Sequence, residues 1–440
     1  MLKYIFALSL TLTSVALAAP PAPQVVTLDD VVKKVSTENY NVYSNALRVY
    51  QARESVQVAR MNLLPKLNIW RLAGAAVEVV LGGYSGNGVA VAAGVLTVID
   101  DIAPFLVPAN WFRVKESKLL YLADQEGYRA LWANELMSAK ALYVHLLLDA
   151  SLLAHIEESK RELAELLTIV RSRELLGGAP QGASRDIEIR TLALQEDKRA
   201  LEALLAEEES LLAYMMAYPA EAMLRPAPLE MPDFENFQPL DYADFVFRAV
   251  DSAPELRQYD HFIAASDYVK SEVMYSFLGT SSMSRGVAGG VFDSLPAQSG
   301  LGFGTPASMR VVAAQKELLK AQRKGVEETI KRHLKLLVTN YNLDLENYAG
   351  LKRRALLTLE ANAQLYERMR LGQNVDTLDL IEASRNHIQA DTSFFAVKFR
   401  FITNEDKLAR LIFHGDYTKK PIVIDDLKKE TTTVSGRKGS

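Results

Sequence analysis

Proline is absent from two long stretches of this chain, residues 109–179 and 307–420. Inside an α-helix a proline removes a backbone hydrogen-bond donor and clashes with the preceding turn, which costs about 3 kcal/mol. Both stretches are also rich in Leu, Ala, Glu, Lys and Arg, the residues that favour helices. A helix of about 60 residues would be about 90 Å long, so it must pack lengthwise against other helices. The sequence therefore predicts a mainly α protein with long, coiled-coil-like helices.

The clearest periodic pattern lies in the second of these stretches. Mostly apolar residues recur there at alternating spacings of three and four, which is the heptad pattern of a helix packed along a partner. The alternative, a surface helix on a compact core, more often shows a broader apolar stripe. A weaker copy of the pattern begins at Ile187. The stronger seam consists of Leu380, Ala383, His387, Ala390, Phe394, Val397, Phe401, Asn404, Leu408 and Leu411.

The N-terminus has the form of a secretory signal peptide. An apolar run reaches Ala16-Leu17-Ala18, the small-x-small pattern that signal peptidase cuts, so residues 1–18 are excluded from the expected fold. The chain has no cysteine, which excludes disulfides, a lipid-anchored N-terminal cysteine and thiolate metal sites. The net charge is −4, and basic and acidic residues are interspersed, so the chain lacks the basic surface that nucleic-acid binding requires.

The mature chain divides into two similar halves. Residues 28–32 align with residues 242–246, and residues 175–187 match residues 370–380. Such internal similarity predicts a structural repeat. The expected organisation is a signal peptide at 1–18, a first repeat at 19–225, a linker at 226–239, a second repeat at 240–417 and a disordered tail at 418–440.

A Leu-Leu-Pro-Lys-Leu segment at 63–67 ends the first expected helix, and Leu371-Gly372 leads into Asp379-Leu380-Ile381-Glu382-Ala383. With the signal peptide and the duplicated halves, this order of parts resembles the TolC family of outer-membrane efflux proteins, over nearly the whole mature chain. The resemblance implies a homotrimer whose long helices form a hollow α-barrel across the periplasm, with a small β portion in the bacterial outer membrane. It also implies two partners, a periplasmic adaptor protein and an inner-membrane pump.

The resemblance further assigns two kinds of site. It places pore-constricting carboxylates at Asp379 and Glu382, and adaptor-docking tips at Gly177-Gly178 and Leu371-Gly372. Two acids three residues apart share one helix face, and threefold symmetry would multiply them into a ring of six. The alternative is that Asp379 and Glu382 only favour the first turn of a helix through its dipole, which contributes about 0.3–1 kcal/mol.

The expected membrane segments, residues 68–108 and 273–306, depart from the family pattern. Strands of a membrane barrel alternate between apolar and polar residues, whereas the first segment is almost continuously small and apolar. It is therefore either a reduced or divergent barrel or an apolar segment that replaces the barrel. Trp70 and Trp111 flank this segment, as interfacial anchors do, although packing in a core beside the helix ends would also explain them.

No pattern in the sequence indicates an enzyme. The six histidines are scattered without metal-ligand spacing, and no cofactor is expected. The expected function is a passive, periplasm-spanning exit duct of a tripartite efflux or type I secretion system, in the outer membrane with most of its mass in the periplasm. The alternative is a barrel-less periplasmic structural or scaffolding protein that keeps the helical body and conducts nothing.

Overall fold

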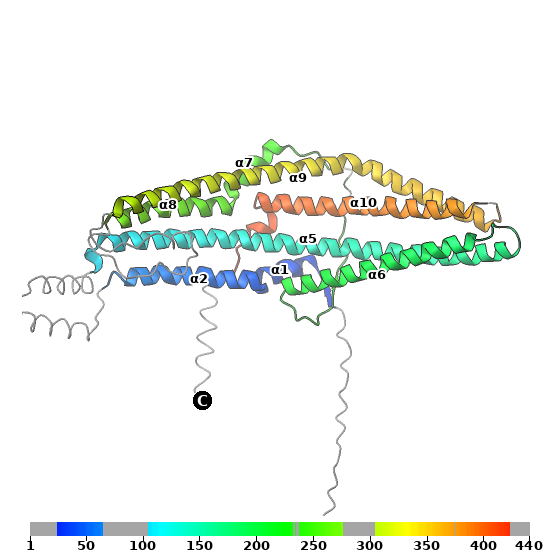
Figure 1. Ribbon diagram of the computed structural model, residues 1–440, viewed down its shortest axis with the longest axis horizontal. Helices are drawn as coiled ribbons and strands as arrows, with labels where there is room; N and C mark the ends of the chain where they lie inside the picture. The colour runs from blue at the N-terminus through cyan, green and yellow to red at the C-terminus, as the bar shows by residue number, and fades with distance from the viewer. Residues whose placement is uncertain are drawn as a thin grey trace, which may run out of the picture.

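The computed structural model describes residues 24–64, 104–231, 234, 237–275, 304–373 and 375–422. The expected signal peptide, most of both expected membrane segments and most of the expected tail lie outside these residues. The described part is an elongated bundle whose long helices run nearly parallel to one axis (Figure 1).

Two helices run the whole length of the bundle. They are α5, Pro108–Leu175, with 68 residues, and α9, Thr305–Arg370, with 66 residues. Each has a proline in its first turn, Pro108 in α5 and Pro306 in α9, where backbone N–H groups have no acceptor within the helix. At 1.5 Å per residue each helix is about 100 Å long. The prediction of two long helices is confirmed.

Four helices of intermediate length lie in two rows, each row made of two helices end to end. The first row is α2, Tyr40–Met61, and α6, Ala183–Met215, which follow one side of α5. The second row is α8, Pro254–Tyr275, and α10, Thr377–Leu411, which lie between α5 and α9 (Figure 1). Consequently α9 forms one long edge of the molecule, and the row of α2 and α6 forms the other.

Short elements complete the bundle. Asn39 separates α1 from α2 and caps α2 with its side chain, and Ala253 separates α7 from α8. A parallel pair of strands, with Gln24 opposite Leu224, ties the start of the described chain to the segment after α6. These elements are β1, Gln24–Val26; α1, Leu28–Glu38; η1, Pro104–Leu106; β2, Leu224–Pro226; α7, Tyr242–Ser252; and η4, Gly415–Thr418.

The apolar core forms separate clusters along the bundle. The cluster near the α5–α6 and α9–α10 turns joins all four of these helices, and the predicted α10 seam faces inward, with no member exposed. Burial of this seam on one side of α10 agrees with the heptad pattern. The buried members of the cluster are Leu163, Leu166, Val170, Ala183, Ile187, Leu194, Met369 and Leu380.

Candidate functional site

The residues assigned to docking and constriction all lie at one end of the bundle. The α5–α6 and α9–α10 turns meet there, at the right of Figure 1. We call these two turns the first tip and the second tip. The first tip joins Leu175 to Ala183, and the second joins Arg370 to Thr377. Asn374, in the second tip, lies outside the described residues.

Both tips begin with the same backbone motif. Gly177 has φ +73° and Gly372 has φ +82°, the left-handed region in which glycine has no side-chain penalty. After each glycine, the next N–H bonds back to the end of the helix: Gly178 donates to the Arg173 carbonyl at 2.8 Å, and Gln373 donates to the Arg368 carbonyl at 3.0 Å. This is the Schellman arrangement, which satisfies the last carbonyls of α5 and α9.

Arg173 connects the first tip to the second. Its Nη2 donates to the Met369 carbonyl at 2.9 Å, and its Nη1 donates to the Gln373 carbonyl at 3.2 Å. Met369 lies in the last turn of α9, where the helix dipole favours a cation, and Gln373 lies in the turn that follows. A guanidinium can serve two carbonyls at once because its N–H groups form a rigid fork. Arg173 therefore fastens the second tip to α5.

The helices that follow the tips are capped in different ways. Glu174, at the end of α5, accepts hydrogen bonds from the N–H groups of Gly182, at 2.8 Å, and Ser184, at 3.0 Å, at the start of α6. Hydrogen bonds hold the pKa of the Glu174 carboxyl below its usual value. The bonds from Ser184 have the largest effect, and the bond from Gly182 adds to it. The start of α10 is capped instead by its own N-cap residue, Asp376, which accepts from the Leu378 N–H at 3.1 Å.

Asp379 and Glu382 lie on the exposed face of the first turns of α10. Leu380, between them in sequence, is fully buried in the cluster that joins the four helices. Within the part of the chain that the structure describes, neither carboxylate has a hydrogen-bond or ion-pair partner. The Asp376 side chain caps the Leu378 N–H of this turn, and Asp379 also lies in the first turn, where the helix dipole favours an acid. Their position facing a pore stays a prediction.

The tips present leucines to solvent. Leu175 and Leu176 are 88% and 85% exposed, and Leu371 and Leu378 are also exposed. Large apolar side chains rarely lie so far out of a core without a partner surface. The assignment of Gly177, Gly178, Leu371 and Gly372 to docking stays a prediction. The structure places the exposed Leu175 and Leu176 directly before Gly177.

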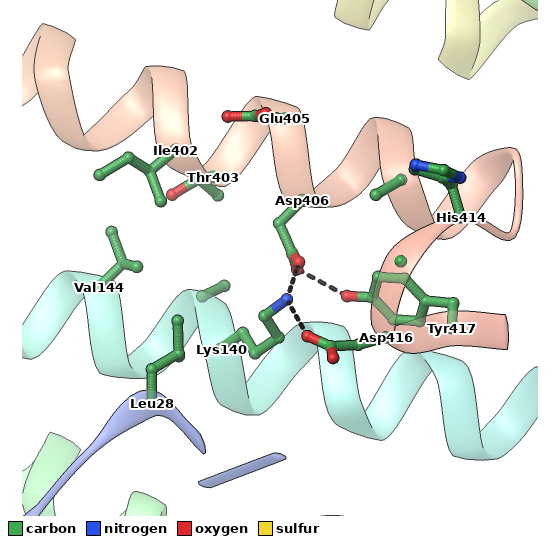
Figure 2. A pocket seen from close by; sticks show the side chains of 13 residues that line it. Leu28, Lys140, Val144, Ile402, Thr403, Glu405, Asp406, His414, Asp416 and Tyr417 are labelled. Atoms are coloured by element: carbon green, nitrogen blue, oxygen red, sulfur yellow. Dashed lines mark hydrogen bonds and ion pairs between the residues drawn. The ribbon is translucent and has the colours of Figure 1, made fainter. Parts of the chain in front are cut away.

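A charged network near the middle of the bundle fixes the end of α10 to α5. Lys140 of α5 lies between two carboxylates: it pairs with Asp406, and its Nζ is 3.2 Å from Asp416 Oδ2 (Figure 2). The Tyr417 hydroxyl donates to Asp406 at 2.6 Å, and burial raises the pKa of that phenol, so it keeps its proton. A cavity of about 260 Å³ lies beside these groups. The network anchors the C-terminal end of α10, whereas Asp379 and Glu382 lie near its N-terminal end.

The described residues include no group of three or more His, Cys, Asp or Glu side chains arranged to hold a metal ion. Arg173, Glu174 and Lys140 form hydrogen bonds or ion pairs that join one helix or turn to another. Their arrangement can bind and position helices, and it exposes carboxylates and leucines at one end.

Comparisons with known proteins give no match to any family model and no match among curated proteins. Solved structures do match, over about nine-tenths of the chain. A membrane protein from Pseudomonas aeruginosa has 13% sequence identity and a TM-score of 0.67, covering 90% of this chain and 92% of that one. The outer-membrane channel OprN has 13% identity and a TM-score of 0.66, with coverage of 89% and 90%.

The CmeC outer membrane channel from Campylobacter jejuni has 11% identity and a TM-score of 0.64, with coverage of 92% of this chain and 88% of that one. At such identities the likeness concerns the fold. The fold predicted from the sequence is confirmed: this chain has the TolC-like fold of outer-membrane channels.

Proposed function

We propose that this protein is the outer-membrane channel component of a tripartite efflux or type I secretion system, a passive duct across the periplasm. The observation that carries the proposal is the likeness to outer-membrane channels over about nine-tenths of both chains. Energy would come from an inner-membrane pump, and the duct itself would need neither cofactor nor catalytic residue.

The two edges of the molecule support assembly into a ring. On one edge, α9 exposes Leu336, Leu343 and Leu357 at a spacing of seven residues or its double. On the other edge, α6 and α2 together expose a second apolar row. Helices with apolar faces at this spacing pack along a partner helix. The exposed members of the second row include Ile189, Leu204, Leu211, Tyr40, Tyr43 and Leu47.

The edges are different surfaces, so a contact between them joins one copy head to tail with the next. Contacts of this kind close into a ring when the rotation between copies allows it. A homotrimer would cover both apolar edges of every copy and leave an axial passage between them. The expected trimer therefore has a physical cause in the exposed residues of α9, α6 and α2.

In that trimer, Asp379 and Glu382 would contribute six carboxylates around the axis. A ring of carboxylates selects for cations and opposes its own closure by repulsion. The first and second tips, with Gly177, Gly178, Leu371 and Gly372, would dock the periplasmic adaptor. The exposed Leu175 and Leu176 would supply apolar contact area for it.

Single-channel recording in planar lipid bilayers tests the proposal. We expect purified trimers to conduct with a preference for cations, and the variant Asp379→Ala/Glu382→Ala to lose most of that preference. The matched control is Asp244→Ala/Asp251→Ala, which removes two exposed carboxylates from α7, away from the apolar rows of α9, α6 and α2, and should leave selectivity unchanged. Unchanged selectivity in the first variant would refute the assigned constriction. A non-conducting monomer would refute the channel itself and favour a structural role.

A further inference from the structure

The end of the bundle opposite to the tips exposes a tryptophan. Trp111, in the first turn of α5, is 50% exposed, and its indole Nε1 donates to the Phe105 carbonyl at 2.8 Å. The sequence left two interpretations of this residue, core packing or an interfacial anchor. Its exposure excludes core packing within the described chain. The hydrogen bond fixes the ring at the surface with its polar edge satisfied.

Trp111 belongs to a wider exposed patch. Apolar side chains from α2, η1, α5 and α8 surround this end, and we call them the apolar collar. A collection of this size on several neighbouring elements indicates an interaction surface rather than scattered exposure. The apolar collar consists of Met61, Leu64, Phe105, Leu106, Trp111 and Met274.

Basic side chains lie next to the apolar collar, on the side toward the middle of the bundle. Among the described residues, four helices reach this end, and each carries one exposed cation within about two turns of it. A long basic side chain can place its charge at a phosphate while its methylene groups lie along apolar surface. We call these residues the basic ring: Arg60 of α2, Lys115 of α5, Lys270 of α8 and Arg310 of α9.

The course of the chain indicates what the apolar collar and the basic ring contact. Residues 65–103 leave the described chain after Leu64 and re-enter it at Pro104, and residues 276–303 connect α8 to α9 at the same end. The first of these stretches is rich in small and apolar residues, so this end adjoins a part of the chain that is suited to contact with hydrocarbon. Aromatic residues beside cations are characteristic of a membrane–water interface.

We propose that the apolar collar and the basic ring bind the periplasmic phospholipid surface of the outer membrane. The helical body would then be a lipid-contacting element in its own right. Trp111 and Leu106 lie at the boundary between headgroups and acyl chains, and the basic ring contacts lipid phosphates. This inference rests on the proposed function, because it requires the protein to be inserted in that membrane.

Site-directed spin labelling can test this contact, because the chain has no native cysteine. Leu106→Cys places a nitroxide label in the apolar collar, at a residue that is 64% exposed. Phe247→Cys, on α7 near the middle of the bundle, is the matched control, because Phe247 is an apolar residue that is 76% exposed. The full-length protein would be reconstituted in vesicles of phosphatidylethanolamine with a minor fraction of phosphatidylglycerol. Power saturation would then compare access of the labels to oxygen and to a nickel chelate.

We expect the label at 106 to have an oxygen-to-nickel accessibility ratio several-fold higher than the label at 247. Transfer to vesicles in which doxyl groups mark the upper acyl chain should broaden the signal at 106 only. Equal, water-like access at both positions would overturn the proposal. So would a label at 106 that neither reagent reaches, because protein would then cover the apolar collar.

The same samples separate this inference from the proposed function. Vesicles that conduct while the label at 106 is in water would refute the lipid contact alone. Vesicles that contain inserted protein but never conduct would refute the channel and still report on the label. Trp111→Phe and Trp111→Ser give a second measurement on the inserted protein, since phenylalanine keeps the apolar ring and should leave the oxygen-to-nickel accessibility ratio at 106 unchanged, whereas serine should lower that ratio.

Discussion

The hairpins α5–α6 and α9–α10 have the same residue types at equivalent positions, but these residues make different contacts. Asp149 and Asp344, Arg173 and Arg368, and Gly177 and Gly372 are each separated by the same number of residues. The glycines form the same turn, but Arg173 reaches across to α9. The Arg368 side chain, within the described residues, bonds only to Gln373 of its own turn, at 3.0 Å. The first hairpin therefore holds the second at the turn that leads into α10, the helix that carries Asp379 and Glu382.

The two buried aspartates differ in the same way. Asp149 is 9% exposed and lies against Glu208 of α6, while Asp344 is 8% exposed and pairs with Arg400 of α10 at 2.6 Å. One hairpin thus joins its helices by a carboxyl–carboxyl pair and the other by an ion pair. Equivalent positions of one helical scaffold can therefore carry opposite electrostatic arrangements, a pair of acids in one hairpin and an acid–base pair in the other.

Arg173→Ala should have the largest effect. The substitution removes two hydrogen bonds between a cation and the end of α9, so we expect a loss of about 2–3 kcal/mol in the free energy of unfolding. Because the second tip is then unfastened, the proposed channel should also spend more time open. Chemical denaturation and single-channel recording would measure the two effects.

Arg368→Ala is the critical control, because this arginine occupies the equivalent position and contacts only an exposed glutamine. It should change stability by less than about 1 kcal/mol. Arg171→Ala, which removes an exposed pair with Glu188, should behave in the same way. Equal losses for Arg173→Ala and Arg368→Ala would show that the first hairpin does not hold the second.

Arg400→Ala should have the next largest effect. It leaves the buried Asp344 carboxylate without its described partner, and one of its oxygens, Oδ2, already has no hydrogen bond. The side chain of Arg400 is half exposed, so water can replace part of the interaction, and we expect a loss of about 1–2 kcal/mol. Arg400→Lys should recover part of it. Urea denaturation of the solubilised protein would measure these losses, and no loss in the alanine variant would contradict the pairing.

Substitution of the tip glycines should have a smaller and equal effect. Gly177→Ala and Gly372→Ala each force a side chain into the left-handed region, which destabilises by about 1 kcal/mol. The space around each position is open, since a Cβ at Gly372 would meet only the Arg173 Nη2 atom, at 3.8 Å. The thermal midpoints of the two variants should therefore fall together. A much larger loss at one position would show that the turns are not equivalent.

The sequence predicted those elements that are determined by residues close together in the chain. Proline marked the starts of α5 and α9, and the Leu-Gly pairs marked both tips, because one residue type decides whether a helix continues there. The heptad pattern likewise identified the buried face of α10 before any partner was known.

The connections between hairpins could not be predicted in this way. Arg173 and Met369 are 196 residues apart, and nothing in the sequence around Arg173 distinguishes it from the neighbouring Arg171. Their roles differ only because α9 ends beside one of them. The pairing of Asp149 with Glu208 has the same origin, since both residues look like ordinary acids on a solvated helix face. Asp379 and Glu382 are exposed on α10, and their role in a pore stays a prediction that the conductance measurement tests.

The smallest effect should be a pH dependence that belongs to the first hairpin alone. Burial, and then the charge of Asp149, raise the pKa of Glu208 to about 7 from an ordinary value of 4.5. A carboxyl whose pKa is raised by folding contributes stability below its unfolded pKa and loses it as the pH rises through the folded pKa. His145 and Glu207 also act on the pair, with opposite signs.

Glu208 is only partly buried, so solvent weakens the effects of burial and of the Asp149 charge on its carboxyl. We therefore expect Glu208 to lower the free energy of unfolding by about 1 kcal/mol between pH 5 and pH 8. In Glu208→Gln, which keeps a hydrogen-bond donor to Asp149, that part of the decline should vanish. Glu196→Gln, an exposed carboxyl on the same helix, should retain it. Urea denaturation across this pH range would measure the difference. A decline in Glu208→Gln as steep as in the wild type would mean that the two carboxyls do not share a proton, and that the contrast between the buried aspartates has no electrostatic consequence.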